Sequence, residues 1–213
     1  MPSAVRGPSA ARERDAWAGG RLLVGVDEAG RGPLAGPVVA AAVAFPPFAP
    51  RLRGVRDSKV LSAARRASLA QAIRSRAAVV GIGAASPRLI DQVNIRVATA
   101  IAMRRAVRRA LGLAPLCRVH LVVDGLPFPE IGLDHEALVD GDALCYTVAA
   151  AGIIAKTVRD RIMTRLAIRH PGYGWASNMG YGTPDHLIGL EVAGPTAHHR
   201  RSFAPVGQLR LSL

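Results

Sequence analysis

The sequence predicts an α/β fold with a mixed sheet. Strand-like segments come first, and helices and strands then alternate along the chain, which is the element order of that class. Half of the 213 residues are hydrophobic, so we expect one sizeable domain with a buried core and an appendage. No apolar run reaches the roughly 18 residues needed to span a membrane.

Five segments have the composition of strands and are bounded by turn residues. The first runs into an acidic pair, and Pro46–Pro47 ends the second. The segments are residues 21–28, 36–45, 77–85, 117–125 and, as a short fifth strand, 136–142.

Helix-start signals lie between the strands and recur near the C-terminus. Serine is a favoured N-cap, and proline is favoured at the first helical position. The predicted helices begin after Ser62, run from Ser86–Pro87 to Gly112 with a break near Asn94, cover residues 149–170, and begin again at Thr183–Pro184.

The N-terminal segment and the two cysteines indicate the cellular compartment of the protein. Residues 1–20 lack the apolar stretch of a secretory signal and predict a flexible, basic extension before a domain over residues 21–213. Cys117 and Cys145 lie in apolar surroundings, which favours buried thiols over a disulfide framework. This cysteine usage fits a reducing cytoplasmic setting. We expect a monomer that does not enter a membrane.

The positive charge predicts a polyanionic partner. Lysine and arginine number 28 against 15 acidic residues, which gives a net charge of +13 and a pI near 11.4. Such a balance indicates nucleic acid, although a genome that favours Ala, Arg and Gly would produce a similar composition. Only Lys59 and Lys156 are lysines. In an arginine-rich chain, a retained lysine indicates a place that needs a compact, flexible ammonium group.

Acidic residues end two of the predicted strands. In an open α/β sheet, ligands bind outside the carboxyl ends of parallel strands. Asp27 and Asp124 can therefore share a ligand if the first and fourth strands are parallel neighbours. Glu28 joins them only if the first strand breaks there, and Asp142 offers a fourth oxygen ligand. Taken singly, an Asp before Gly, such as Asp124, more often marks a turn.

The set of acids predicts a metal site more strongly than any one acid does. Clustered carboxylates repel one another unless a cation or proton lies between them. Oxygen ligands suit Mg²⁺ or Mn²⁺ rather than Zn²⁺, and two such ions support phosphodiester hydrolysis.

The loop Gly30–Ala35 matches the dinucleotide fingerprint G-x-G-x-x-A by letter. We reject that interpretation, because the fingerprint opens a helix and here a strand-like run follows. The neighbouring acids would also repel a pyrophosphate. Glycines without a Cβ instead allow the backbone to approach a sugar closely, and Arg31 would then hold a phosphate.

Six motifs occur in one order along the chain. They are "GVDEAGRGPLAGPVV", "DSK", "VDG", "IIAKTVRD", "GYGT..H" and "HHRRSF". With them the sequence resembles ribonuclease HII, the type 2 ribonuclease H, over about residues 21–207.

The resemblance implies a fold and an activity. The fold is ribonuclease H-like, with a five-stranded mixed sheet flanked by helices and a C-terminal helical part. The implied enzyme is an endonuclease that uses Mn²⁺ or Mg²⁺. It cleaves the RNA strand of RNA–DNA hybrids and cuts 5′ of a single ribonucleotide in duplex DNA, leaving a 3′-hydroxyl and a 5′-phosphate.

The resemblance also assigns residues to roles. The implied catalytic and metal-binding acids are Asp27, Glu28, Asp124 and Asp142. The implied nucleic-acid contacts are Gly30, Arg31 and Gly32 at the ribose 2′-hydroxyl, Tyr181 on the sugar, Lys59 at a phosphate, and Arg200 in the basic tail.

Four residues depart from the family pattern. Asp140 replaces a lysine before the fourth acid, which leaves open a second frame in which Asp140 is itself that acid. Ala149 and Gly152 replace two serines, and Met179 replaces a lysine. The changes remove hydroxyls and cations, so weaker binding or an altered metal preference is expected.

Three smaller signals have two interpretations each. His198–His199 form a solvated basic turn or contact a metal or phosphate. Lys156 pairs with Asp160 at i,i+4 or supports the acid cluster. Four arginines at helical spacing form a solvated face or a hybrid-binding flank. They are Arg104, Arg105, Arg108 and Arg109.

Two functions remain as hypotheses. The first is the metal-dependent endonuclease. The alternative is a non-catalytic module that binds RNA–DNA hybrids, because a charge of +13 would bind nucleic acid without chemistry. The acids discriminate between them, since a mere binder gains nothing from four carboxylates where a phosphate must approach.

Overall fold

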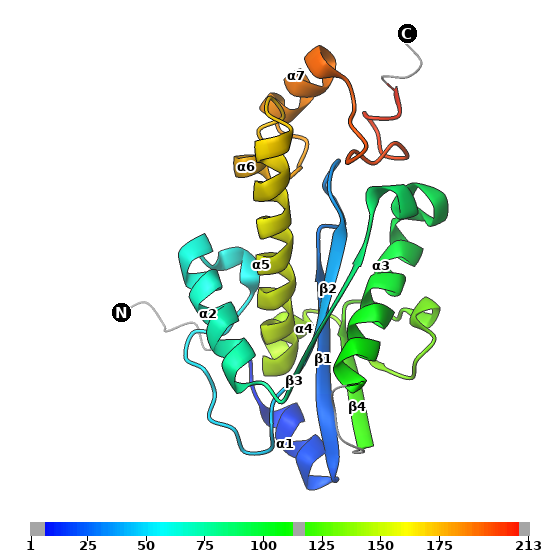
Figure 1. Cartoon of the computed structure of the whole chain (residues 1–213). Helices are drawn as coiled ribbons and strands as arrows, with labels where there is room; N and C mark the ends of the chain where they lie inside the picture. The colour runs from blue at the N-terminus through cyan, green and yellow to red at the C-terminus, as the bar shows by residue number, and fades with distance from the viewer. Residues whose placement is uncertain (1–6, 113–117, 209–213) are drawn as a thin grey trace.

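The computed structural model describes residues 7–112 and 118–208 and contains one five-stranded mixed sheet (Figure 1). The strand order is β3-β2-β1-β4-β5. β1 pairs antiparallel with β2 and parallel with β4, and β5 continues the parallel half. The strands are β1 (Arg21–Ala29), β2 (Val38–Ala44), β3 (Val79–Ala85), β4 (Arg118–Asp124) and β5 (Glu136–Leu138).

Helices cover both faces of the sheet, with α3 and α5 on opposite sides of the strands and α6 and α7 at one end (Figure 1). None of the helices in the described residues is long and apolar enough to cross a membrane. The helices are α1 (Ala11–Ala18), α2 (Ala63–Arg76), α3 (Pro87–Leu111), α4 (Gly141–Leu144), α5 (Tyr146–Arg169), α6 (Trp175–Asn178) and α7 (Pro184–Ala193), with 3₁₀ turns η1 (Ser58–Val60) and η2 (Pro129–Ile131).

Small residues allow the helices to lie close to the sheet. Every residue of β2 is buried, and all of them are alanine or valine. On β3, a Cβ at Gly81 or Gly83 would lie 2.0 Å from a backbone carbonyl oxygen of α3. The close approach therefore depends on these two glycines, and it builds a core of short, tightly packed side chains.

The predicted elements are largely confirmed. Ser62 caps α2 by accepting a hydrogen bond from the Arg65 backbone N–H, and Ser86 caps α3 in the same way. Helix α3 breaks at Asn94, as predicted, where φ is +66°. Cys145 is buried, whereas Cys117 lies outside the described residues.

The fifth strand is shorter than predicted. We expected a strand over residues 136–142, but β5 ends at Leu138. Asp140 then adopts a left-handed backbone conformation with φ +55°, and Asp142 lies in the short helix α4. A left-handed residue cannot continue a strand, so the turn at Asp140 moves Asp142 off the sheet.

The expectation of a flexible N-terminal extension is wrong for its described part. Residues 11–18 form α1, and Glu13 in this helix is only 2 % exposed. Its Oε1 accepts hydrogen bonds from the backbone N–H and the hydroxyl of Thr147, at 2.8 and 2.7 Å. The N-cap of α5, Cys145, makes no side-chain cap bond of its own. Glu13 therefore caps the central helix from another part of the chain.

The thiol of Cys145 belongs to the same cluster. It donates a hydrogen bond to Glu13 at 3.4 Å. Burial, followed by the nearby Glu13 charge, raises the pKa of Cys145 to about 12. The thiol therefore stays protonated and unreactive at neutral pH.

Replacing Glu13 with alanine should destabilise the protein by about 1–3 kcal/mol, because the buried N–H of Thr147 loses its acceptor. Urea unfolding at equilibrium measures the change. The matched control is Asp15→Ala on the exposed side of the same helix, which should stay within about 0.5 kcal/mol of wild type. Equal effects of the two substitutions would contradict the cap.

Candidate active site

The carboxyl ends of β1 and β4 bring the predicted acids together. The two strands are parallel neighbours, and their pairing ends at Val26 and Val123. Asp27 and Asp124 follow directly. We expected that Glu28 could join the other acids only if β1 broke there. The strand does not break at Glu28, because its pairing with β2 continues to Ala29. Release from β4 alone frees this end of the strand.

One pocket of about 210 Å³ collects most of the predicted site residues. Its walls come from the end of β1, the glycine loop, the η1 turn, the end of β4, α5 and the loop before α7. The lining includes Asp27, Glu28, Asp124, Gly30, Arg31, Gly32, Lys59, Lys156 and Tyr181. The residues of the predicted site that do not line it are Asp142 and Arg200.

Backbone N–H groups orient two of the acids. The N–H of Glu28 donates to Asp27 Oδ1 at 2.6 Å, and the N–H of Gly141 donates to Asp124 Oδ1 at 2.7 Å. The second bond ties the end of β4 to α4. Behind Asp27 lies Gly152 of α5, where a Cβ would stand 2.3 Å from Asp27 Oδ2. The glycine that departs from the family pattern therefore leaves the space that this carboxylate occupies.

Burial and mutual repulsion raise the pKa values of the acids. Desolvation raises the pKa of Asp27 well above its usual range, and the charges of Glu28 and Asp124 add to the shift. Desolvation also raises the pKa of Glu28, although Arg31 opposes it. The pKa of Asp124 rises for the same first reason, against hydrogen bonds from the backbone. The site therefore concentrates negative charge at a cost in stability.

The donor set fits a hard divalent cation. All the candidate ligands are carboxylate oxygens, which suit Mg²⁺ or Mn²⁺. Within residues 7–112 and 118–208, no three acidic, histidine or cysteine side chains are already grouped as a metal-holding set.

Of the two candidates for the fourth acid, the charge interactions within the site favour Asp142. Its charge acts on Asp27 and Lys59. Desolvation raises the pKa of Asp142, and the charges of Asp57 and Asp124 raise it further. Asp140 is exposed and influences Asp124 alone among these acids. Asp57, which the sequence analysis did not single out, is thus a fifth acid beside the site.

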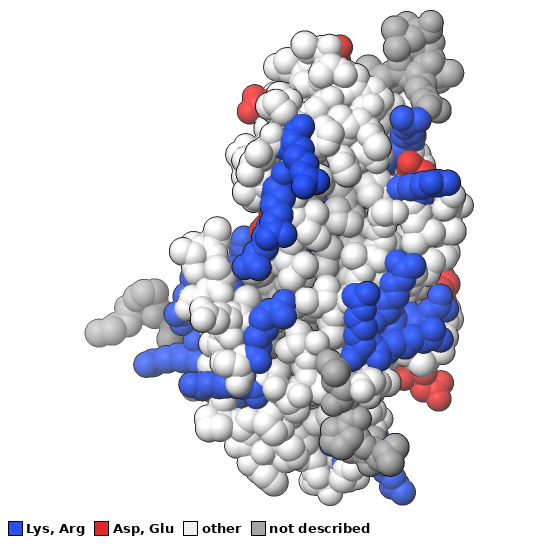
Figure 2. All heavy atoms as spheres, viewed as in Figure 1, with Lys and Arg blue, Asp and Glu red and all other residues white. Residues whose placement is uncertain are grey.

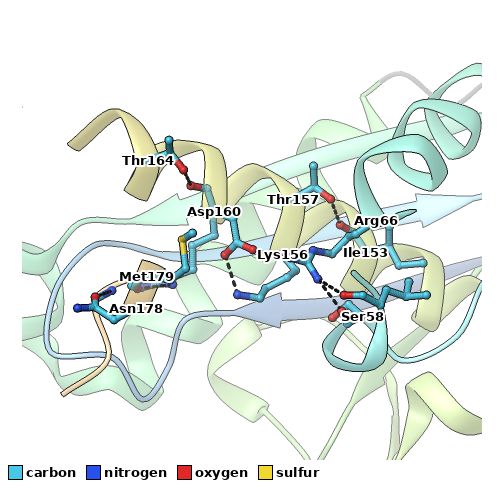
Figure 3. Close-up of polar contacts among 12 residues, drawn as sticks. Ser58, Arg66, Ile153, Lys156, Thr157, Asp160, Thr164, Asn178 and Met179 are labelled. Carbon is cyan, nitrogen blue, oxygen red and sulfur yellow. Dashed lines mark hydrogen bonds and ion pairs between the residues drawn. The ribbon is translucent and has the colours of Figure 1, made fainter. Parts of the chain in front are cut away.

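A buried ion pair holds the turn that carries Lys59 (Figure 3). Asp160 accepts from Lys156 at 2.7 Å and from Arg66 at 2.9 Å. Arg66 also donates to the carbonyl of Ser58, the residue before Lys59. The predicted pair of Lys156 and Asp160 is confirmed, and Lys156 reaches the pocket as well.

Two buried arginines hold the glycine loop. Arg159 donates to the carbonyls of Ala35, Pro37 and Met179 at 3.0–3.1 Å. Arg200 donates to the carbonyls of the loop from Gly30 to Gly36. A Cβ at Gly30, where φ is +93°, would collide with the Arg159 side chain.

The expected nucleic-acid contact at Arg200 is wrong. Its side chain is fully buried at 0 % exposure, and the loop carbonyls occupy its donors. Burial, followed by the charge of Arg159, lowers the pKa of Arg200 to about 9. Arg200 therefore holds the glycine loop from inside the fold, a position that only the tertiary structure reveals.

The expectation of a solvated turn at His198–His199 is also wrong. His199 is 1 % exposed and lies 3.0 Å from His186, between their Nε2 atoms. Burial, followed by the charge of His186, lowers the pKa of His199 to about 4. The pair is therefore neutral, and the other ring nitrogen of His186 lies 2.9 Å from the carbonyl of Tyr181. This chain of contacts fixes the backbone of Tyr181, whose side chain is 47 % exposed at the pocket.

Basic side chains on the face shown in Figure 2 gather over α2 and α5 and, separately, over α3. On α3, Arg105 and Arg109 donate to carbonyls of the edge strand β3, at Ala84 and Ile82. Two of the four arginines that the sequence analysis singled out on this helix therefore cover a sheet edge, which protects that edge from pairing with another strand.

The sheet order and the acidic pocket together define the class of protein. A parallel pair β1–β4, flanked by antiparallel β2 and β3, with acids at its carboxyl ends in a basic chain, is the arrangement of a ribonuclease H-like nuclease. A family model described as ribonuclease HII matches residues 24–206, and the chain belongs to this family. It is an endonuclease of the kind that cleaves RNA in RNA–DNA hybrids.

Individual relatives agree with the family. The ribonuclease HII of Synechococcus sp. (strain JA-3-3Ab) is 49% identical over 95% of this chain and 91% of its own length. That of Sphingopyxis alaskensis is 53% identical over 89% and 92%. Among solved structures, the ribonuclease H2 of Pyrococcus horikoshii OT3 has a TM-score of 0.72 at 25% identity, covering 90% of this chain and 98% of that one.

Replacing Arg200 with methionine should lower hybrid cleavage by about a hundred-fold, because a loop displaced by about 1 Å no longer orients its substrate. Stability should also fall, since buried carbonyls lose their donors. Arg200→Lys should recover only part of the activity, because one ammonium group cannot replace the guanidinium fork. The control is Arg201→Met at the exposed neighbouring position. A loss of activity of the same size in this control would refute the role of Arg200 in holding the loop.

Replacing Asp27 with asparagine should stabilise the protein by about 1 kcal/mol at pH 7 without divalent ions, although it removes a catalytic acid. Because the pKa of Asp27 is raised in the folded state, the folded protein holds this proton more tightly than the unfolded chain does. Wild-type stability therefore falls as the pH rises through that range, and the gain from Asp27→Asn shrinks as the pH is lowered.

Thermal unfolding at several pH values measures this gain. Mg²⁺ or Mn²⁺ should raise the melting temperature of wild type more than that of the variant, because the ion binds the folded acids. Asp134→Asn, at an exposed position outside the pocket, should change neither quantity. A variant less stable than wild type at pH 7 would contradict the repulsion.

Proposed function

We propose that this ribonuclease HII cuts on the 5′ side of a ribonucleotide, in RNA–DNA hybrids and at single ribonucleotides in duplex DNA, and leaves a 3′-hydroxyl and a 5′-phosphate. The observation that carries the proposal is a shared pocket, in which Asp27, Glu28 and Asp124 face the same space as the glycine loop and Tyr181. The acids that would cleave the backbone and the groups that would recognise the sugar can thus contact the same nucleotide.

The acids Asp27, Glu28, Asp124 and Asp142 would hold divalent ions, either Mg²⁺ or Mn²⁺. Bound there, such ions activate water and stabilise the leaving oxygen of a phosphodiester. A ribonuclease HIII from Bst with the same fold has been solved in complex with Mn²⁺, at 19% identity and a TM-score of 0.67. The oxygen-only donor set of the pocket supports the same class of ion here.

The residues of the chain itself choose the ribonucleotide. Buried Arg200 donates hydrogen bonds to the carbonyls of Gly30 and Arg31. The polar backbone groups of Gly30, Arg31 and Gly32 can therefore recognise a 2′-hydroxyl with little reorganisation. Tyr181 offers an exposed ring against which a sugar packs.

Lys59 supplies a cation for the phosphate. Burial lowers its pKa, but the acids around it, with Asp57 first, raise it by more. The side chain is therefore charged at neutral pH and stands beside the carboxylates.

The acids and the groups that recognise the sugar all come from one chain, so the proposed mechanism needs no second subunit. The alternative, a non-catalytic hybrid-binding module, is disfavoured by the same pocket. Buried like charges destabilise the fold and repel phosphate, and a binder has no use for them.

The test uses a labelled DNA duplex with one ribonucleotide, incubated with wild type or Asp124→Asn in Mn²⁺, Mg²⁺ or EDTA. We expect one cut 5′ of the ribonucleotide with either ion and none in EDTA. Asp124→Asn should be at least about a thousand-fold slower, as expected when a group needed for transition-state charge stabilisation is lost.

Asp134→Asn should cut like wild type, because its side chain lies outside the pocket. A parallel RNA–DNA hybrid reports the family activity independently. Cleavage of the hybrid without any cut at the single ribonucleotide would overturn the junction proposal alone, and binding without cleavage of either substrate would favour the binding module.

A further inference from the structure

The loop between β2 and η1 carries arginines at positions 51, 53 and 56. It lines a pocket of about 470 Å³ that is separate from the catalytic pocket and is completed by Gly7. The loop lies before α2 in Figure 1, on the side where basic side chains gather in Figure 2. The loop lies between two of the family motifs, "GVDEAGRGPLAGPVV" and "DSK", so the predicted site does not include it.

The backbone of the loop is held in place. The N–H of Leu52 donates to the Tyr146 hydroxyl at 2.8 Å, and the carbonyl of Arg53 accepts from Arg65 at 3.0 Å. Val55 is buried at 3 % exposure, and Gly54 makes the bend with φ +90°. A loop anchored at these points presents its side chains in a defined arrangement.

The arginine side chains of this loop are exposed and unpaired. Across the described ranges, Arg51, Arg53 and Arg56 make no ion pair and no side-chain hydrogen bond. Arg51 only stacks on the ring of Tyr146, at 5.5 Å. By contrast, Arg66 in the next helix is paired and buried. The three loop arginines therefore concentrate positive charge that no acidic side chain of the described residues neutralises.

The loop leads directly into the active site. Only Asp57 and Ser58 separate Arg56 from Lys59, which lines the catalytic pocket. Consecutive Cα atoms are about 3.8 Å apart, so the two Cα atoms lie within about 11 Å. One strand of a duplex carries a phosphate about every 3.4 Å along its axis. The span therefore corresponds to about three phosphates beyond the one at Lys59.

We propose that Arg53 and Arg56, with Arg51 beside them, form a second phosphate-binding site, which holds the backbone of the duplex away from the cleaved nucleotide. The ligand is a phosphodiester backbone and not a free nucleotide, because the pocket is lined by arginine, glycine, leucine and valine and offers no exposed ring for a base. The proposal rests on the activity of the family toward nucleic acid. The second site would add affinity for the duplex without sequence preference.

The test measures binding of a labelled duplex by fluorescence anisotropy over a series of salt concentrations. All proteins carry Asp124→Asn so that the duplex stays intact. The test variant adds Arg53→Gln and Arg56→Gln. The slope of log affinity against log salt should become shallower by about 0.9 for each lost phosphate contact. A duplex shortened on the side that reaches the loop should bind wild-type and variant loops equally.

The control variant carries the same loss of two charges at the starts of β1 and β4, the strand ends opposite the acids, where Arg21 and Arg118 are exposed. Its slope should match that of the parent. Replacing Arg53 and Arg56 with lysine should retain the slope, because lysine also neutralises phosphate.

The proposal is overturned if the glutamine variant keeps the parental slope, or if the control loses as much as the test variant. The cleavage assay on protein with Asp124 intact reports on the proposed function separately. Normal cleavage together with an unchanged salt slope in the Arg53→Gln, Arg56→Gln variant would therefore contradict the second phosphate site and leave the proposed function intact.

Discussion

The glycine loop can stand beside the acids only because two buried guanidinium groups satisfy its carbonyls. Gly30 to Gly36 run close to the protein interior, where unpaired carbonyls are costly. Arg159 reaches the loop from α5, and Arg200 reaches it from the C-terminal segment. Neither arginine has a carboxylate partner among the described residues. The loop carbonyls therefore take the place of carboxylates as partners of these two buried charges.

Helix α5 connects all parts of this arrangement. Its N-terminus is capped by Glu13, its glycine at position 152 makes room for Asp27, and Lys156 one turn later reaches the pocket. Arg159 follows under the loop, and Met163 packs into the C-terminal core. The segment before the matched family region is thus packed against the helix that reaches the pocket.

Charge is distributed to serve binding and cutting at the same time. The chain carries +13 overall, yet the acids face one another in a small pocket. The positive surface attracts a polyanion over a range set by ionic strength, whereas the acids are stable as a group only with a cation. Repulsion in the metal-free pocket is a local instability that the function requires.

The sequence by itself determined the element order, the capped helices, the break at Asn94, and the acids at the strand ends. These depend on local rules, namely hydrophobic periodicity, capping chemistry and turn residues. The family motifs added the nature of the reaction, because long ordered motifs are specific.

Only the tertiary structure decided what the buried charged groups do. Glu13, His199 and Arg200 are polar by composition and were therefore expected on flexible or solvated segments, yet each is at most 2 % exposed. Their partners lie far away in the sequence, as with Glu13 and Thr147 or Arg200 and Gly30. A buried polar group is tolerated only when it forms hydrogen bonds with such partners. A local sequence pattern cannot predict a hydrogen bond between segments that are so far apart in the sequence.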